Sequence, residues 1–494
     1  MQIPFVLLQV ILVPIIAALI CVPLGRRYGK NAGWLVVGAL TYTTLLLISV
    51  GFGIWSGPGQ LSEIYSWSNA AFSLKFGFLA DGLSLPVAII MNLVCAASAV
   101  FSIRYMEHRI TDLYGPDRKG MYAIYYSTYL LFSVGLVGVA LATNLIELYL
   151  FVELTLIPSY IMIDLFGYVD RHRIAMMYFI WNHVGAALFL IGIVLASSGT
   201  GSFNISALST LAGTQLGLVV CLFILIGWLI KMATFGFHVW LPYAHGEHPT
   251  AIAAIIATIV GLGSYVIVRL LFGELFATFQ TFSLPLMTLA VITLIYGAFL
   301  TMAQDDVKRL YACSTISQTA YSILGIASMV PLGVAGGVFY FISHVLGKCI
   351  LFSVAGILIT QTGVRKMSQM GGLAKRMPLT ATLCILGSMI LSAVPPMSGF
   401  QAEWIMFVGI FTKGAAGDLA FLVIGIIAIF GTFLTAVYTF WPVMRMFFGP
   451  LPQNMENVKE APLSMTVPLF VLAAASLLMG LFPNIVMHFL TAII

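Results

Sequence analysis

Four ionisable side chains lie inside apolar stretches long enough to cross a lipid bilayer. Lys231 follows LGLVVCLFILIGWLI, Glu153 lies in LYLFVELTLIPSYIMI, Lys348 in FISHVLGKCILFSV and Glu403 in PPMSGFQAEWIMF. An ionisable group at membrane depth costs a few to ~10 kcal/mol, so it needs a partner or a water-filled cavity. Several such groups in one chain predict a path along which charge moves.

Glu153 and Lys231 are the natural ion pair of this set. A buried charge loses its stabiliser when its counter-ion moves away, so a pair that opens and closes can take up a proton on one side and release it on the other. This chemistry predicts a proton switch. The alternatives are a static salt bridge and a protonated acid bonded to a backbone carbonyl.

Two further groups extend the series. His344 and Lys348 are four residues apart and share one helix face, which predicts a proton relay. Glu403 follows the helix-breaking PPMSG and is expected to end the series. A hydrogen-bonded packing histidine and an acid that caps the resumed helix are the alternatives for His344 and Glu403.

The weaker candidates are Glu147, His183, His238, His245 and His248. Glu147 precedes Glu153 by six residues, about 9 Å along one helix, and is either a second proton acceptor or a residue at headgroup level. The last three histidines are expected at the cytoplasmic mouth of the seventh and eighth spans, where they feed protons or cap loops.

The composition excludes a soluble protein. Of 494 residues, 61% are hydrophobic and only 8% are charged, as in polytopic membrane proteins. The net charge of +5 comes from loops, so we expect no nucleic-acid partner. The six cysteines are scattered singly, and neither a P-loop nor a strand-bound GxGxxG is present. We therefore expect neither a metal nor a cofactor in this chain.

About fourteen apolar runs have the length of about 20 residues that a spanning helix needs. The sequence therefore predicts an all-α polytopic membrane protein. The polar stretch 55–80 predicts a small hairpin outside the membrane. The runs lie near 3–24, 32–54, 80–103, 121–142, 144–166, 174–198, 215–237, 250–272, 283–303, 306–328, 331–361, 379–412, 418–448 and 464–490.

Basic residues predict the orientation of these spans. Alternate loops carry almost all of the lysine and arginine, as the positive-inside rule requires of cytoplasmic loops, and both termini are then expected outside. The basic loops hold Arg26, Arg27, Lys30, Arg104, Arg109, Arg118, Lys119, Arg171, Arg173, Lys308, Arg309, Arg365, Lys366, Lys375, Arg376, Arg445 and Lys459, and the opposite loops Lys75, Arg269 and Lys413.

Three spans are expected to be interrupted: the seventh after Lys231, the eleventh around His344 and Lys348, and the twelfth at VPPMSGF. Irregular backbone at membrane depth is tolerated where it lines protein or a wet cavity, and paired broken helices point to a transport site. Lys231 and Glu403 are 172 residues apart, and Glu153 and Gln318 are 165 apart. These spacings predict two inverted five-helix repeats over 121–272 and 283–448, with flanking helices in 1–120 and 449–494.

Five motifs together resemble a known family: FVELTLIPSYIMI, FHVWLPYAHGEHPT, LYACSTISQ, ISHVLGK and PPMSGFQAEW. Their types and order are similar to the antiporter-like, proton-translocating subunits of respiratory complex I and its relatives. Because glutamate stands at position 403, the chain most resembles the M-type (chain 4) subunit.

The resemblance implies that Glu153 and Lys231 are the essential pair, that His344 belongs to a central hydrophilic axis and that Glu403 is its terminal group. It further implies L- and N-type sibling subunits, with quinone, flavin and iron–sulfur clusters bound in partners and no redox cofactor here. The location expected is a prokaryotic plasma membrane.

The chain departs from the M-type pattern at two places. Gly261 stands where a lysine on the eighth helix is usual, and Gln318 where the tenth helix commonly has histidine, so Gln318 is a secondary candidate. We hypothesise that Lys348 takes the central role. Three other functions stay open: a multisubunit cation/proton antiporter subunit, a membrane-bound hydrogenase subunit and a scaffold that does not pump.

Overall fold

Helices make up almost all of the chain that the computed structural model describes, which is residues 3–57, 59–66 and 75–492. The predicted all-α polytopic class is therefore confirmed. The helices of the first part are α1 (Val6–Tyr28), α2 (Gly33–Ser56), α3 (Ser84–Tyr114), α4 (Lys119–Leu141), α5 (Leu145–Phe166), α6 (Arg171–Thr200), α7 (Gln215–Lys231), α8 (Trp240–Glu247) and α9 (Thr250–Val266).

The second part continues in the same way. Its helices are α10 (Phe276–Phe279), α11 (Ser283–Met302), α12 (Val307–Ala327), α13 (Pro331–Thr362), α14 (Pro378–Leu391), α15 (Ser398–Ala415), α16 (Leu419–Phe447), α17 (Leu463–Leu481) and α18 (Asn484–Leu490). A π-helical turn, Ile267–Phe272, extends α9. Short 3₁₀ turns lie at Gly29–Ala32, Ile205–Leu211, Gln280–Phe282, Met367–Gln369, Leu373–Lys375 and Gln453–Met455.

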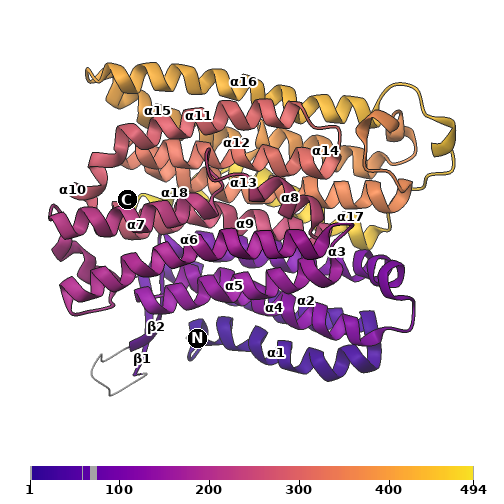
Figure 1. Cartoon of the computed structure of the whole chain (residues 1–494), viewed down its shortest axis with the longest axis horizontal. Helices are drawn as coiled ribbons and strands as arrows, with labels where there is room; N and C mark the ends of the chain where they lie inside the picture. The colour runs from indigo at the N-terminus through magenta and orange to yellow at the C-terminus, as the bar shows by residue number, and fades with distance from the viewer. Residues whose placement is uncertain (1–2, 58, 67–74, 493–494) are drawn as a thin grey trace.

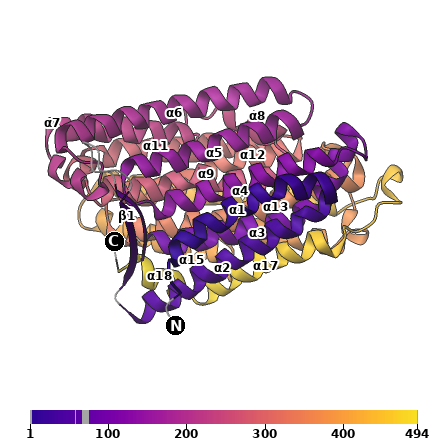
Figure 2. The same cartoon turned by 90° about the horizontal axis from the view of Figure 1, so that it is seen from below.

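The long helices lie side by side along the longest axis of the molecule (Figures 1 and 2). Both ends of the chain lie toward the end of the bundle that carries the β-hairpin, and the α16–α17 connection lies at the opposite end. This arrangement agrees with an even number of crossings between the two termini.

The predicted hairpin is present as two paired strands, and the residues that join them lie outside the described ranges; its place outside the membrane stays a prediction. Strands β1 (Gln60–Ser66) and β2 (Lys75–Asp81) pair antiparallel. Glu63 of β1 accepts the free backbone N–H groups of Leu7 and Leu8 at the start of α1, at 3.1 and 2.9 Å. These contacts stabilise a helix start that has no side-chain cap of its own.

Ten helical segments of the described chain are long and apolar enough to cross a membrane, with α1, the following turn and α2 counted as one. The protein is therefore an integral membrane protein. The predicted seventh, tenth and twelfth spans are absent from these ten, because α7 and α14 are short and α12 is polar. The count of fourteen crossings stays a prediction.

Two of the three predicted interruptions are confirmed. The seventh span divides into α7 and α8, and the twelfth into α14 and α15. The predicted break in the eleventh span is wrong, because α13 runs without interruption from Pro331 to Thr362. Its polar residues are held inside a regular helix that packs against α9, α12, α14 and α15 on its different sides.

The two breaks share one backbone geometry. In the first, Ala233 has a φ of 52° and the Thr234 N–H donates to Leu229 O at 3.2 Å; in the second, Ala393 has a φ of 52° and the Val394 N–H donates to Met389 O at 3.0 Å. Each pair of matching residues is separated by 160 positions. At this spacing Lys231 corresponds to Leu391, so the correspondence between Lys231 and Glu403 inferred from the sequence is wrong.

A second backbone hydrogen bond also recurs. In each case it joins the start of a helix, α5 or α12, to a loop residue further along the chain. The Leu145 N–H donates to Phe203 O at 2.9 Å, and the Val307 N–H donates to Arg365 O at 3.0 Å, again with one common spacing of 162 positions. Gln318 therefore matches Leu156 rather than Glu153. Residues of similar type therefore do not occupy matching positions in the two halves, although the backbone hydrogen bonds recur.

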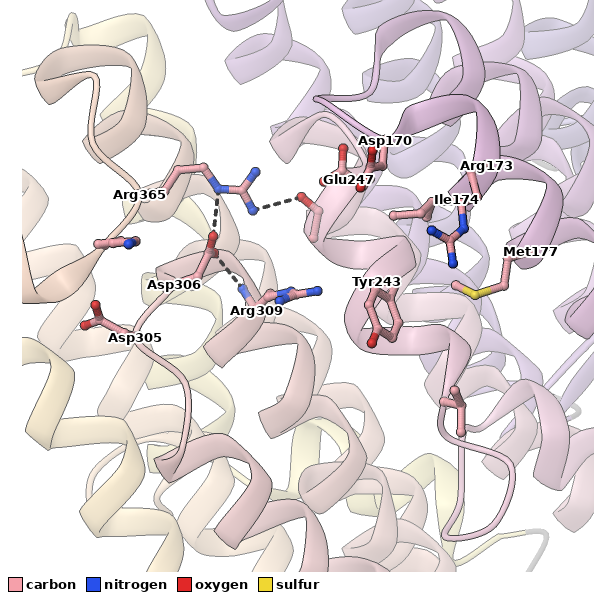
Figure 3. Close-up of a pocket in the computed structure, with 13 residues that line it drawn as sticks. Asp170, Arg173, Ile174, Met177, Tyr243, Glu247, Asp305, Asp306, Arg309 and Arg365 are labelled. Carbon is pink, nitrogen blue, oxygen red and sulfur yellow. Dashed lines mark hydrogen bonds and ion pairs between the residues drawn. The ribbon is translucent and has the colours of Figure 1, made fainter.

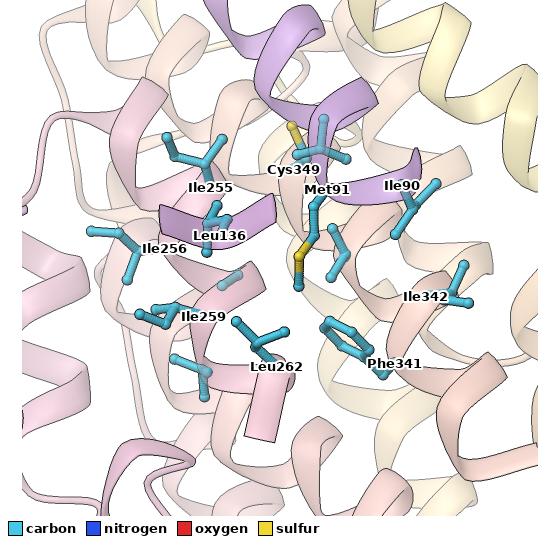
Figure 4. Close-up of a cluster of buried hydrophobic side chains, with 14 of the residues drawn as sticks. Ile90, Met91, Leu136, Ile255, Ile256, Ile259, Leu262, Phe341, Ile342 and Cys349 are labelled. Atoms are coloured by element: carbon cyan, nitrogen blue, oxygen red, sulfur yellow. The ribbon is translucent and has the colours of Figure 1, made fainter. Parts of the chain in front are cut away.

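The centre of the bundle divides into an apolar and a polar region. Apolar side chains of α3, α4, α9 and α13 pack together around Met91, Leu262 and Phe341 (Figure 4). Beside them, α12 buries the run from Ser314 to Thr319, which is polar except for Ile316, with each residue 0–2% exposed. Because every buried polar group needs a partner, α12 is the helix that carries hydrogen bonds through the core.

Candidate functional site

Lys231 is the last residue of α7 and points into the protein. The residue is 2% exposed, and its Nζ has no hydrogen-bond partner in the described chain. The carbonyl end of a helix favours a cation, which lowers the cost of this position. The break thus places an ammonium group in the interior without closing it in an ion pair.

Glu153 lies on α5 beside His183 of α6. Its Oε2 is 3.7 Å from Nδ1 of His183, and its Oε1 is buried without a hydrogen-bond partner among the described residues. Glu153 is near enough to act electrostatically on Lys231, but the structure shows no contact within 4 Å between them in the part it describes. The predicted pair is open in this conformation.

His344 and Lys348 project from the continuous α13. Lys348 is fully buried; its Nζ donates to the Tyr311 carbonyl at 2.9 Å and to the Ser314 hydroxyl. The Nε2 of His344 has no partner within the described chain. Lys348 is therefore held by neutral oxygens of α12 and not by a carboxylate.

His245 of α8 joins these two residues. It is fully buried, neither ring nitrogen has a partner in the described part of the chain, and both Lys348 and His344 are near enough to interact with it electrostatically. We call His245, His344 and Lys348 the central cluster. The sequence ranked His245 below the other two, because it did not show that α8 packs against α12.

His245 lies near the end of α8 and His248 directly follows that helix, and their predicted place at a cytoplasmic mouth stays a prediction. Both residues are 0% exposed. His248 donates from Nδ1 to the Ala244 carbonyl at 2.7 Å and contacts the Ser159 hydroxyl at 3.1 Å, so both of its nitrogens are occupied. His238 lies in the break itself, where Nε2 contacts the Tyr296 hydroxyl at 3.1 Å.

An open cleft of about 730 Å³ lies between the end of α8 and the start of α12, and Gly246 and Glu247, which directly follow His245, line it. Its charged lining includes Asp306, which accepts from Arg365 Nε at 2.8 Å (Figure 3). Arg365 also donates to the Gly246 carbonyl at 3.3 Å. These contacts join the α12 start to the α8 end around a space that solvent can fill.

Lys308 is a functional candidate that sequence reasoning missed. It was counted as a loop lysine, yet it is 0% exposed, and its Nζ donates to the His248 carbonyl and lies 4.2 Å from the centre of the Tyr168 ring. The lysine interacts electrostatically with Glu247, whose Oε2 is buried without a partner in the described chain. Lys308 thus lies between the cleft and the central cluster.

Glu403 lies in the second turn of α15 and is 5% exposed. It accepts a hydrogen bond from the Thr432 hydroxyl, and no cation lies within 4 Å of it in the described chain. Thr432 accepts from Tyr321 at 3.3 Å, so Glu403 is tied to the polar face of α12.

Gln318 is the other end of this polar region. Its Nε2 donates to the Tyr438 hydroxyl at 2.7 Å and to the Leu391 carbonyl at 3.3 Å, and its Oε1 accepts from Tyr340 at 2.8 Å. Gln318 is therefore a fully hydrogen-bonded amide of the interior. It contacts the second break through Leu391.

Glu147 lies apart from these groups, beneath the hairpin. Its Oε2 accepts from Asn144 Nδ2 at 3.1 Å and from the backbone N–H groups of Thr143 and Gly77 at 3.2 and 3.4 Å. These donors at the start of α5 offset part of the cost of burying the carboxylate, while its Oε1 is buried without a hydrogen-bond partner in the described chain. Both interpretations of Glu147 from the sequence, a second proton acceptor and a headgroup-level residue, stay predictions.

The place of the missing lysine on the eighth span is filled by an aromatic ring. A Cβ on Gly261 would lie 2.3 Å from the Phe341 ring, and a Cβ on Gly263 would lie 2.5 Å from the Met232 side chain. Figure 4 shows Phe341 among the apolar residues of α9, including Leu262. No group of three or more His, Cys, Asp or Glu residues within the described ranges could hold a metal ion.

Residues 142–435 match the family described as NADH:quinone oxidoreductase/Mrp antiporter, TM. Residues 67–112 match the family described as NADH-Ubiquinone oxidoreductase (complex I), chain 5 N-terminus. Because the first match covers more than half of the chain, this protein belongs to the NADH:quinone oxidoreductase/Mrp antiporter family of membrane subunits. The resemblance indicated by the sequence motifs is confirmed.

Two relatives are similar to this chain over most of its length. It is 30% identical to NAD(P)H-quinone oxidoreductase chain 4-2 of Synechocystis sp. (strain ATCC 27184 / PCC 6803 / Kazusa), over 91% of this chain and 80% of the relative. It is also 30% identical to F(420)H(2) dehydrogenase subunit M of Methanosarcina mazei, over 96% of this chain and 94% of the relative.

Two solved complexes contain a chain of the same fold. The Mrp complex from Dietzia sp. DQ12-45-1b matches with a TM-score of 0.86 and 20% identity, covering 99% of this chain and 97% of that chain. Respiratory complex I from Thermus thermophilus with bound NADH matches with a TM-score of 0.85 and 23% identity, covering 99% and 98%. At these identities the likeness establishes the fold.

Proposed function

We propose that this chain is a proton-translocating membrane-arm subunit of a complex I-like, quinone-reducing oxidoreductase, and that it couples electron transfer in partner subunits to proton movement. The observation that carries the proposal is the interior position of Lys231, His344, Lys348 and Glu403, which are 0–5% exposed at membrane depth. Such groups are expensive in a bilayer and mark ion pathways.

The proposed driving step is closure and opening of the pair formed by Glu153 and Lys231. Moving one charge against 100 mV requires about 2.3 kcal/mol. Removing one partner from a buried ion pair costs about 3–5 kcal/mol, so one such opening supplies enough free energy. The open arrangement of the two side chains is one of the two states that this switch needs.

Protons are proposed to reach the central cluster from the cleft through Glu247 and Lys308. Lys348 then serves as the central titratable group in place of a residue on α9. This role is supported by its burial, by the two α12 oxygens that hold it, and by Phe341 at the Gly261 position. Glu403 is the proposed terminal acceptor.

The recurring backbone contacts support two five-helix repeats of inverted topology, over 121–272 and 283–448, with flanking helices in 1–120 and 449–494. Both termini are placed on the outer side of a prokaryotic plasma membrane. Partners are sibling membrane subunits of the L and N types, and quinone, flavin and iron–sulfur clusters belong to partner subunits. The chain itself is proposed to bind no redox cofactor.

The test is proton movement in the complete purified complex after reconstitution into vesicles. Electron transfer to a quinone should acidify or alkalinise the vesicle lumen, as followed by a pH-sensitive dye, and Glu153→Gln should abolish this change. An unchanged signal in Glu153→Gln would contradict the proposal. Identification of the companion chains in the same preparation supplies the second readout.

A cation/proton antiporter subunit is the second candidate, favoured by the fold shared with a chain of the Mrp complex. It predicts companion chains without redox centres, and a sodium gradient in place of quinone reduction would then drive proton movement. A membrane-bound hydrogenase would instead co-purify with hydrogenase subunits. A non-pumping scaffold, suggested by Gly261, would show no proton movement under either driving force.

A further inference from the structure

The polar face of α16 contains a row of hydroxyl groups that the proposed pathway has not yet used. Thr432, Thr435 and Tyr438 follow one another at helical spacing, and Tyr321 of α12 lies against them. We propose that Tyr438, Thr435, Tyr321 and Thr432 form a hydroxyl relay that exchanges protons with Glu403. This inference rests on the proposed proton-translocating function and adds the residues of its last step.

The relay is continuous in hydrogen bonds. The oxygens of Tyr438 and Thr435 are 3.2 Å apart, those of Thr435 and Tyr321 are 3.1 Å apart, and those of Tyr321 and Thr432 are 3.3 Å apart. Thr432 donates to Glu403 Oε1. The path from Tyr438 to the carboxylate therefore contains no gap wider than a hydrogen bond.

Each hydroxyl can accept one proton and donate another, which is the property that a relay requires. When Thr432 gives its proton to the Glu403 carboxylate, it takes one from Tyr321, which takes one from Thr435. The Thr435 hydroxyl donates to Tyr438 in the structure, so it turns to Tyr321 before it takes a proton from Tyr438. The proton that Tyr438 gives up is replaced by one from the proposed pathway through Lys348. One O–H bond forms at Glu403, one proton is taken from that pathway, and each of the four hydroxyls ends with the proton count it had at the start.

Burial favours this role over a loose surface network. Tyr321 is 0% exposed, Tyr438 and Thr435 are each 1% exposed, and Glu403 is 5% exposed. No salt bridge to Glu403 occurs in the described chain, so the hydroxyls are the groups that receive or supply its proton. A hydrogen-bonded network in this low-dielectric interior is strengthened by cooperativity.

Gln318 is a positioning residue for the relay. Its Nε2 donates to the Tyr438 oxygen at 2.7 Å and its Oε1 accepts from Tyr340 at 2.8 Å, which fixes the outer end of the row. An amide carries protons poorly, so the relay begins at Tyr438. This assigns Gln318 an orienting role rather than a place on the secondary proton path.

Thr435→Val is the sharpest test, because Thr435 belongs to the relay without touching Glu403. Valine keeps the shape of threonine and removes the hydroxyl. In the reconstituted whole complex, proton movement per electron pair should fall to the level of Glu403→Gln, and Thr435→Ser should restore it. Thr439→Val is the matched control, because Thr439 lies on the same helix and is 2% exposed, and among the described residues its hydroxyl bonds only to carbonyls of α16.

A second readout separates a relay from a packing effect. Difference infrared spectroscopy of the complex follows the carboxyl band of Glu403, assigned through Glu403→Gln, across a pH series. Thr432→Val should shift the pH midpoint of this band, and Thr439→Val should leave it unchanged. Tyr321→Phe should slow the rate at which the band responds to a pH jump.

The possible failures are distinguishable. If Glu153→Gln and Lys231→Met pump normally, the proposed function itself is wrong. If these variants fail to pump while Thr435→Val and Tyr321→Phe pump normally with an unshifted carboxyl response, the relay is overturned and the function stands. Loss of pumping in Thr439→Val equal to that in Thr435→Val would also overturn the relay, by showing that any change in this helix is damaging.

Discussion

The two broken helices have the same backbone and opposite contents. The first break, between α7 and α8, places Lys231 at the end of its first half-helix; the second, between α14 and α15, has Leu391 at the matching position. The charge of the second break, Glu403, lies further along, in the resumed helix. The same backbone break therefore follows a lysine, Lys231, in the first case and precedes a glutamate, Glu403, in the second.

The surroundings of these charges differ as much as their positions. Lys231 has no hydrogen-bond partner in the described part of the chain, whereas Glu403 is joined through Thr432 to a row of buried hydroxyls. The difference teaches that an identical break can serve two purposes. The first holds an isolated charge that a neighbour can pair, and the second delivers a proton to an existing network.

The largest effect is expected at the first break itself. Lys231→Met should abolish proton movement in the reconstituted complex, because methionine fills the space without a titratable group. Leu391→Met, at the matching position of the second break, is a volume-conserving change that should cost less than about 1.5 kcal/mol and leave pumping intact. Equal losses in the two variants would refute the functional difference between the breaks.

Lys348→Met should produce a loss nearly as large, because no other cation lies within the central cluster. The measurement is again dye-detected proton movement, with electron transfer recorded in parallel. Lys413→Met is a suitable comparison, since Lys413 lies near the end of α15, 3.8 Å from the Phe421 ring centre. Normal pumping in Lys348→Met beside inactive Lys231→Met would show that Lys348 is not the central group.

The closed ion pair between Asp81 and Arg269 is a reference for the open pair of Glu153 and Lys231. Asp81 of β2 accepts from both terminal nitrogens of Arg269, at 2.6 and 2.7 Å. Asp81→Asn should leave a buried guanidinium unpaired and lower the stability by about 3–5 kcal/mol, as measured by thermal unfolding in detergent. Stability unchanged by Asp81→Asn would mean that the hairpin does not hold α9.

The same pair predicts a pH dependence. Burial raises the pKa of Asp81, but the Arg269 guanidinium and the hydrogen bonds with Ser84 together outweigh burial, so the pKa is below its ordinary value. The pair therefore contributes its full stability above the pKa of an unfolded aspartate, about 3.9, and loses it as the pH falls through the lower folded-state pKa. Asp81→Asn should remove this acid-dependent part of the unfolding curve.

The smallest effect is expected from the backbone of the breaks. Ala233 and Ala393 both have left-handed backbone conformations, which cost a non-glycine residue about 1–2 kcal/mol. Ala233→Gly and Ala393→Gly should each change the unfolding temperature slightly and to the same extent, since glycine relieves this strain but orders at a greater entropic cost. Unequal shifts would show that the two breaks are strained differently.

The sequence predicted the helices and the two true breaks because both depend on local composition. Long apolar runs can satisfy their backbone groups in a bilayer only as helices, and proline and glycine clusters interrupt them. The predicted break around Lys348 was wrong because it did not rest on such a cluster. Its signal was polarity alone, and α13 accommodates polar residues without breaking because α12 supplies their hydrogen bonds.

Correspondence between the halves was misjudged for a physical reason. Charged residues were paired by type, whereas hydrogen bonds of the main chain show which positions are equivalent. Lys308 was missed because its neighbours in sequence are those of an ordinary basic loop. Only the packing of Tyr168 and the α8 end over it turns that loop lysine into a buried one.

The sequence by itself determined the family, the membrane-embedded helical class and the identities of the titratable groups, because hydrophobic length and rare charges within apolar runs are properties of single segments. The tertiary structure decided which of those groups meet. It left Glu153 and Lys231 apart, brought His245 to Lys348, and linked Glu403 to the hydroxyls of α12 and α16. Such contacts join segments that are far apart in the chain, and their distances follow from packing across the whole bundle.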